Sequence, residues 1–157
     1  MRKRIEIEGG CYFVTINALH KRKIFKTNKV KLLYLESLDH CRNKLHFRLT
    51  GYVIMEDHLH LLIIPPKGRT ISDVMHHVNG IFANHYNKQE RKSGKVIQRK
   101  FWEHAIRNDR DFEEKLNYIH NNPVKAGLIK ELEDYKFSSF SNYYSDDGGI
   151  IEIDNVP

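Results

Sequence analysis

The sequence contains few cysteines, few prolines and no long hydrophobic run. Cys11 and Cys41 are its two cysteines and form no CxxC pair, which argues against a disulfide framework or a thiolate zinc site and fits a reducing compartment. The longest aliphatic run covers residues 61–64, far too short to cross a bilayer. The charged N-terminus leads into no apolar signal core. These absences predict a soluble cytoplasmic protein that does not associate with membranes.

The composition is that of an ordinary globular protein. Of 157 residues, 40% are hydrophobic and 29% are charged, which predicts a single domain over residues 1–157. Within it we expect a basic N-terminal arm at 1–10 and a tail at 145–157 without a clear element. The formal net charge of +6 permits nucleic-acid binding but does not require it.

Periodicity predicts a mixed α+β fold. Runs of β-branched, aromatic and alternating residues predict strands over 12–16, 47–53, 58–64 and 96–106. Helical spacing predicts helices that begin near Asn28, Thr70 and Asp111, the last with a capping box to Glu114 and a stop at Pro123. The order strand, helix, strand, strand, helix, strand is that of a ferredoxin-like split βαβ antiparallel sheet.

Two histidines lie two residues apart in the third predicted strand. Because side chains alternate along a strand, His58 and His60 share one face, with Cα atoms roughly 6.6 Å apart. Two imidazoles at that spacing can converge on one metal ion. The alternative is a pair of half-buried sheet histidines that form ordinary hydrogen bonds, and the spacing alone does not decide between them.

A second group of residues lies in the last predicted helix. Glu114, Tyr118 and Asn122 are four residues apart and therefore share a helix face. A tyrosine in that position is usually a partly exposed aromatic. However, Asp57-His58-Leu59-His60 followed by the string 118–128 (YIHNNPVKAGL) resembles the single-tyrosine HUH transposases. The most similar group is the one associated with repetitive extragenic palindromes (REP), and the likeness covers about residues 10–144.

The resemblance implies an enzyme that cuts and rejoins single-stranded DNA hairpins through a 5′-phosphotyrosine intermediate. An added C-terminal helix would carry the catalytic Tyr118 across the open face of the sheet. His58 and His60 would bind Mg²⁺ or Mn²⁺, with Asn122 in the place of the family's third ligand, although Pro123 disfavours helical geometry there. Met55-Glu56-Asp57 stands where the family often has Met-Pro-Asn. Glu114 either orients the tyrosine or is a solvated first-turn glutamate.

The basic side chains provide candidate DNA contacts. Those expected to bind phosphates are Arg2, Lys3, Arg4, Lys21, Arg22, Lys23, Arg99 and Lys100. Tyr86 and Tyr143 are candidate platforms for unpaired bases. Two other functions stay open: a metal-dependent nuclease of the same fold that hydrolyses DNA with water, and a catalytically silent nucleic-acid-binding module. A monomer and a homodimer are both compatible with the sequence.

Overall fold

The computed structural model describes residues 9–155. Arg2, Lys3 and Arg4 of the expected basic arm lie outside the described residues. No helix within residues 9–155 is long and apolar enough to cross a membrane.

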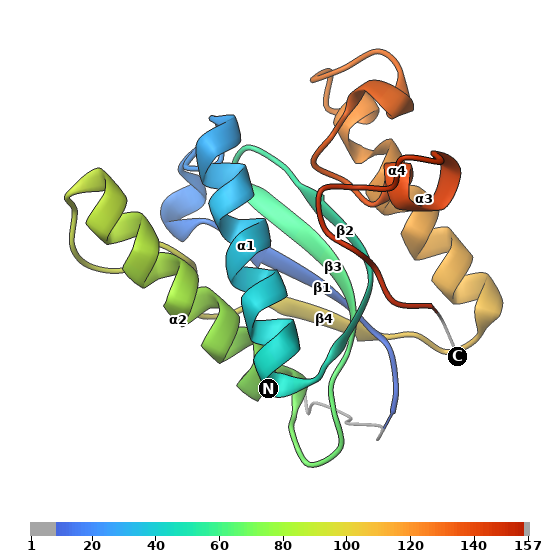
Figure 1. The fold of residues 1–157 in the computed structure, drawn as a ribbon, viewed down its shortest axis with the longest axis horizontal. Coiled ribbons are helices and arrows are strands. Elements are labelled where there is room, and N and C mark those ends of the chain that lie inside the picture. The colour runs from blue at the N-terminus through green and yellow to red at the C-terminus, as the bar shows by residue number, and fades with distance from the viewer. Residues whose placement is uncertain (1–8, 156–157) are drawn as a thin grey trace.

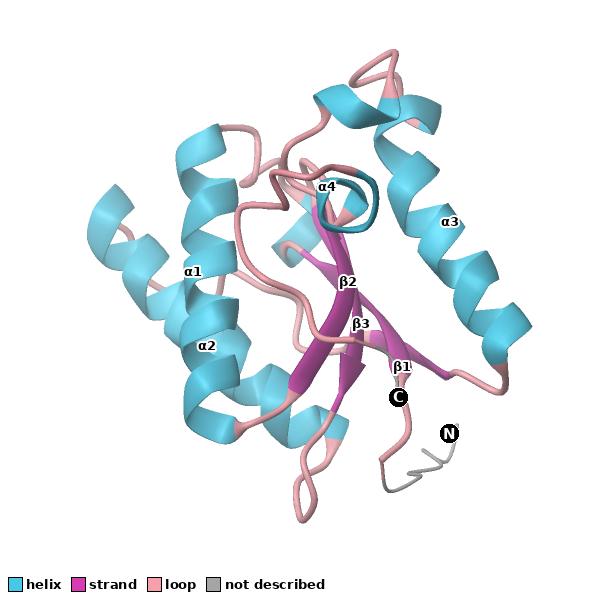
Figure 2. Cartoon of the chain, turned by 45° about the vertical axis from the view of Figure 1, so that its right-hand side comes forward, coloured by secondary structure: helices cyan, strands magenta, loops and turns pink. Residues whose placement is uncertain are grey.

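A four-stranded antiparallel sheet forms the centre of the molecule. Its strands are β1 (Tyr12–Asn17), β2 (Arg48–Ile54), β3 (His58–Ile64) and β4 (Trp102–Ala105), in the order β2-β3-β1-β4. Each neighbouring pair is antiparallel. The helices α1 (Asn28–Leu45) and α2 (Ile71–Glu90) cover one face, and α3 (Asp109–Lys125) lies over the other (Figures 1 and 2). The predicted ferredoxin-like sheet with an added helix is thereby confirmed.

The alternation of β3 divides the apolar core between the two faces. Leu59, Leu61 and Ile63 pack with α1 and α2 in the larger core. Leu62 packs on the opposite face with Leu116 and other residues of α3. His58 and His60 have the same parity as Leu62 and therefore face α3.

Gly51 allows α3 to lie close to β2. A Cβ atom at this position would be 3.1 Å from Leu116 Cδ1 and 3.1 Å from Leu62 Cδ1, which is tighter than an ordinary van der Waals contact. The absence of a side chain at Gly51 therefore sets how closely the helix that carries Tyr118 approaches the sheet.

Three helix boundaries differ from the sequence prediction. Thr27, not Asn28, caps α1, since its side chain accepts a hydrogen bond from the Val30 amide. Asn108, not Asp111, caps α3, and its side chain accepts a hydrogen bond from the Asp111 amide at 2.8 Å. Pro123 lies inside α3, which continues to Lys125. Proline near a helix end removes only one amide donor, so two further residues remain helical.

The fourth strand is shorter than predicted. The expected strand over 96–106 is reduced to Trp102–Ala105, and Ile97 forms an isolated bridge with Ala18. Gln98 donates from its amide to the Asn17 carbonyl at 2.9 Å, so the chain meets the end of β1 before the paired part of β4 begins. By contrast, the predicted helix from Thr70 is confirmed, with a complete capping box to Asp73.

The C-terminal segment packs against the α3 side of the molecule. It contains η2 (Leu132–Asp134) and α4 (Phe140–Tyr144). Residues 145–155 form no helix or strand, yet Asp154 is bonded to Leu49 of β2 through both its amide and its carboxylate. This segment is therefore held along β2.

Candidate active site

Both histidines of β3 are oriented through the same ring atom. His58 Nδ1 is 2.6 Å from Asp57 Oδ1, and His60 Nδ1 is 2.9 Å from Thr15 Oγ1. When Nδ1 carries the proton and donates it, Nε2 keeps its lone pair, and this arrangement is common among histidines that bind metals. The two rings are 4.9 Å apart between centroids, so their Nε2 atoms are available on the same face of the sheet.

The surroundings of His60 keep it neutral. Burial and, to a smaller extent, nearby His58 and Lys21 lower the pKa of the His60 imidazole to about 3. Its Nε2 is buried and has no hydrogen-bond partner among the described residues. An unpaired buried polar atom costs free energy, so this nitrogen points to a missing ligand.

Tyr118 of α3 lies directly over the histidines. Its ring centroid is 5.3 Å from that of His60 and 6.0 Å from that of Phe13, which itself stacks on His60. The side chain is 47% exposed, so the ring is held at one edge while the rest stays accessible. This is the placement needed by a nucleophile that attacks a bound polymer.

Asn122 lies one turn further along α3 and provides a third polar group. Its Nδ2 is buried and has no hydrogen-bond partner in residues 9–155, and a 180° rotation of the amide would put Oδ1 there. Two imidazole nitrogens and an amide oxygen form a donor set that suits a divalent cation. No cluster of three or more His, Cys, Asp or Glu side chains that could hold a metal occurs in the described chain, and the proposed set has only two histidines.

Glu114 lies on the solvent side of Tyr118. A helix turns about 100° per residue, which puts Glu114 about 40° further from the buried stripe than Tyr118 and puts Asn122 about 40° nearer to it. Accordingly, Glu114 is 58% exposed and pairs with Arg110 at 3.3 Å. These contacts support the solvated glutamate over a catalytic one. The i,i+4 spacing predicted a shared face but not its rotation.

Lys115 and Asp111 are neighbours of the site that the sequence did not single out. Lys115 is partly buried, three residues before Tyr118, and its Nζ is 3.5 Å from Asp111 Oδ1. The buried Asp111 carboxylate accepts hydrogen bonds from the Arg107 amide at 3.0 Å and from His104 Nε2 at 2.8 Å. His104 belongs to β4, so this contact fixes the start of α3 to the sheet. Asp-x-x-x-Lys spacing in a helix was the one available signal.

Several predicted DNA-binding residues gather around the histidines. Lys21 acts electrostatically on both Asp57 and His60. Burial tends to raise the pKa of the Asp57 carboxyl, but the hydrogen bond and charge of His58 and the charge of Lys21 outweigh it, and that pKa is lowered. Arg22, Lys23, Arg99 and Lys100 are exposed, and Gln98, just before the last two, contacts Asn17, the cross-strand neighbour of His58.

The two aromatic candidates for base stacking are wrong. Tyr86 is buried in α2, where it packs against Phe82. The Tyr143 hydroxyl donates to the Thr50 carbonyl at 2.5 Å, and burial raises the pKa of this phenol to about 12. Neither ring presents a free face next to Tyr118.

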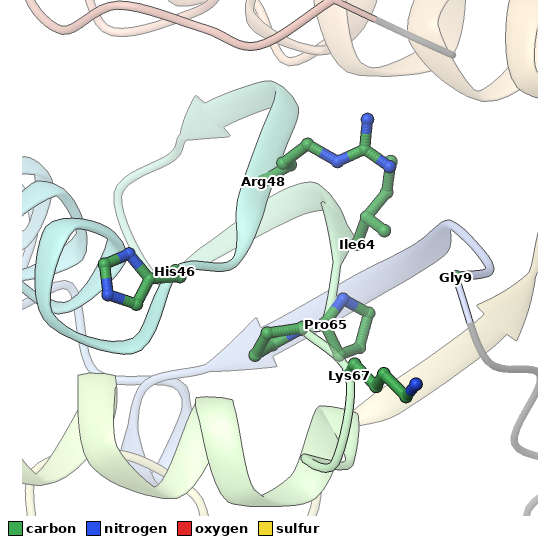
Figure 3. A pocket seen from close by; sticks show the side chains of 7 residues that line it. Gly9, His46, Arg48, Ile64, Pro65 and Lys67 are labelled. Carbon is green, nitrogen blue, oxygen red and sulfur yellow. The ribbon is translucent and has the colours of Figure 1, made fainter.

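A separate hollow lies at the other end of β3. Its volume is about 560 Å³, and Figure 3 shows the side chains that line it. The lining residues are Gly9, His46, Arg48, Ile64, Pro65, Pro66 and Lys67. Ile64 is six residues along the strand from His58, or about 20 Å. The hollow is basic but contains none of the groups around Tyr118.

Comparisons with known proteins agree with this geometry. Residues 10–122 match the family model described as "Transposase IS200 like". The chain is 30% identical over 146 residues to the REP-associated tyrosine transposase of Escherichia coli (strain K12), covering 88% of this chain and 81% of the relative.

Two solved structures share the fold. A REP-associated tyrosine transposase bound to a REP hairpin superposes with a TM-score of 0.81 at 25% identity, covering 99% of this chain and 92% of the other. A structure from Deinococcus radiodurans has a TM-score of 0.54 at 16% identity, over 77% and 97% of the two chains, and supports the fold alone. The chain belongs to the IS200-like transposase family and is an enzyme of its REP-associated tyrosine transposase group.

Proposed function

We propose that this transposase cleaves and rejoins single-stranded DNA next to a hairpin, with Tyr118 as the nucleophile. The observation that carries the proposal is the position of the Tyr118 ring, 5.3 Å from His60, whose buried Nε2 has no partner in the described chain. The solved relative bound to a REP hairpin supports a hairpin substrate. His58, His60 and Asn122 would hold a divalent ion, Mg²⁺ or Mn²⁺.

The metal ligands and the nucleophile have separate tasks. When bound, the ion would polarise the scissile phosphate and neutralise the charge that develops on it. Asp57 and Thr15 keep the two imidazoles in the tautomer that exposes Nε2. A phenol with an ordinary pKa of about 10 is a weak nucleophile at neutral pH, so placing its oxygen in line with the phosphorus is the main contribution of α3.

The proposed step is a transesterification. The Tyr118 oxygen forms a bond to phosphorus while the bond from phosphorus to the 3′ oxygen breaks, and the phenolic proton ends on the departing 3′ hydroxyl. The products are a 5′-phosphotyrosine and a free 3′-OH. Because one phosphodiester replaces another, a second 3′-OH can reverse the reaction without an external energy source. Hydrolysis by water would not conserve the bond.

The proposal is tested by trapping the covalent product. Incubating the protein with a labelled library of single-stranded hairpins and Mn²⁺ or Mg²⁺ should give a slow band on a denaturing gel. We expect this band to vanish in Tyr118→Phe and with EDTA and to persist in Glu114→Gln. Cut DNA without the band would show the hydrolytic nuclease instead. Hairpin binding without metal-dependent cutting, unchanged in His58→Ala, would show the silent binding module.

A further inference from the structure

Trp102 is the most exposed large hydrophobic side chain of residues 9–155. Its relative exposure is 68%, although it lies within strand β4. Its indole has no aromatic partner among the described residues. Exposing so much apolar surface in a regular element is unfavourable unless a ligand covers it.

The register of β4 places the indole on the active-site face. Trp102 is the cross-strand partner of Thr15, and Thr15 Oγ1 is bonded to His60 Nδ1. Two residues on, His104 is bonded to Asp111 of α3. Phe101 and Ala105, of the opposite parity, pack against the other core. Paired residues on neighbouring strands have Cβ atoms about 5 Å apart, so Trp102 is one strand away from the proposed metal ligand.

The charges around Trp102 indicate the kind of ligand. Arg99 and Lys100 precede it and are exposed. The Arg107 side chain, just beyond β4, is 73% exposed. A protein-docking surface would surround the indole with further apolar groups, whereas an aromatic face between cations suits a nucleobase and its phosphates.

We propose that Trp102 stacks on an unpaired base of the strand that contains the scissile phosphate and so positions this strand under Tyr118. The inference rests on the proposed function and adds a residue that holds the substrate without taking part in bond making. Stacking is tolerant of sequence, so Trp102 would orient the strand without selecting its bases.

The protein offers a direct probe, because Trp102 is its sole tryptophan. Excitation of the indole during titration with a single-stranded oligothymidine should quench its fluorescence. A blunt duplex of the same length, which has no unpaired base, should quench it much less. Quenching should persist in Tyr118→Phe, since stacking precedes chemistry. Equal quenching by the duplex, or none by the single strand at saturation, would overturn the proposal.

A variant series provides a second measurement with labelled oligothymidine and fluorescence anisotropy. Trp102→Ala should weaken binding roughly 5- to 150-fold, and Trp102→Phe should restore most of it. Tyr144→Ala is the matched control, because Tyr144 is 64% exposed but belongs to α4, and it should bind like the wild type. Wild-type binding by Trp102→Ala would overturn the proposal.

The two proposals fail differently. A covalent adduct without tryptophan quenching would leave the function standing and remove Trp102 from it. Quenching by single strands without any adduct would keep the base-binding role and remove the tyrosine chemistry.

Discussion

Asp111→Asn should destabilise the protein more than any exposed substitution in α3. The Asp111 carboxylate is 2% exposed and accepts hydrogen bonds from the Arg107 amide and His104, with Lys115 nearby. Asparagine keeps the shape but removes the charge. It also directs an N–H group toward one of these donors. Hydrogen bonds to a buried charge contribute about 1.5–3 kcal/mol each, and breaking a buried pair costs about 3–5 kcal/mol. We expect a loss of about 3 kcal/mol, or roughly 6–12 °C in melting temperature.

The pH dependence of this loss provides a sharper test. Burial acts to raise the pKa of Asp111, but the hydrogen bonds from Arg107 and His104 outweigh it and hold that pKa well below its usual range. A carboxyl whose pKa is depressed by folding stabilises the protein above its unfolded value of about 3.9 and loses this effect as the pH falls further. The free-energy gap between wild type and Asp111→Asn should therefore be full at pH 7 and shrink below about pH 4.

Urea denaturation of both proteins from pH 7 to pH 3 measures the gap. Glu114→Gln is the matched control, because Glu114 is exposed and pairs only with Arg110; its effect should stay within about 0.5 kcal/mol. No gap at pH 7, or a gap of the same size at pH 3, would refute the reasoning about Asp111.

Four further outcomes follow from the site. Thr15→Val should weaken Mn²⁺ binding by about 10- to 100-fold in calorimetry, since it removes the partner of His60 Nδ1, whereas Thr15→Ser should not. His60→Ala should abolish the covalent adduct while single-strand affinity in anisotropy changes only a few-fold; retained cleavage would exclude a role for this ligand. Gly51→Val should cost about 1–3 kcal/mol in urea denaturation, because its Cβ would press on Leu116 and Leu62 at 3.1 Å. Affinity for oligothymidine should fall steeply with added salt, and a flat response would count against the basic surface around Lys21.

Alternation along strands allowed the sheet and the histidine face to be predicted. In β3 the apolar odd positions and the even histidines differ in kind, so one register alone buries Leu59 and Leu61. The same parity placed Trp102 and His104 together, as the structure has them. These predictions depended on a period of two residues, which sequence reports directly.

Helix rotation and helix caps were harder to predict. The spacing of Glu114, Tyr118 and Asn122 defines a face, but the packing of Leu116 near Gly51 decides which edge of that face meets the sheet. Likewise, both Asn108 and Asp111 are suitable caps, and only the burial of Asp111 against His104 distinguishes them. Both failures concern contacts between segments, which local patterns do not contain.

The helix α4 was missed for a similar reason. Its aromatic residues surround His120 of α3, with Phe140 at 5.6 Å and Tyr143 at 5.6 Å between ring centroids. His120 Nε2 is 2.8 Å from Ser139 Oγ, and Ser139 in turn accepts from the Tyr52 amide. Burial lowers the pKa of His120 to about 4, so it is neutral there. A five-residue helix that depends on such contacts has too little periodicity of its own to be recognised.

The candidate site is therefore divided between two supports. Thr15 and Asp57 orient the histidines from within or beside the sheet, whereas Asp111 and His120 attach the helix that carries the nucleophile. A change in one support should leave the other intact because the two share no contact. Asp111→Asn should thus lower adduct yield in the folded protein while Mn²⁺ affinity stays unchanged, and Thr15→Val should lower Mn²⁺ affinity while adduct yield recovers at saturating Mn²⁺. If Asp111→Asn weakened Mn²⁺ binding as much as Thr15→Val, α3 would itself supply an essential ligand, and Asn122 is the residue that could do so.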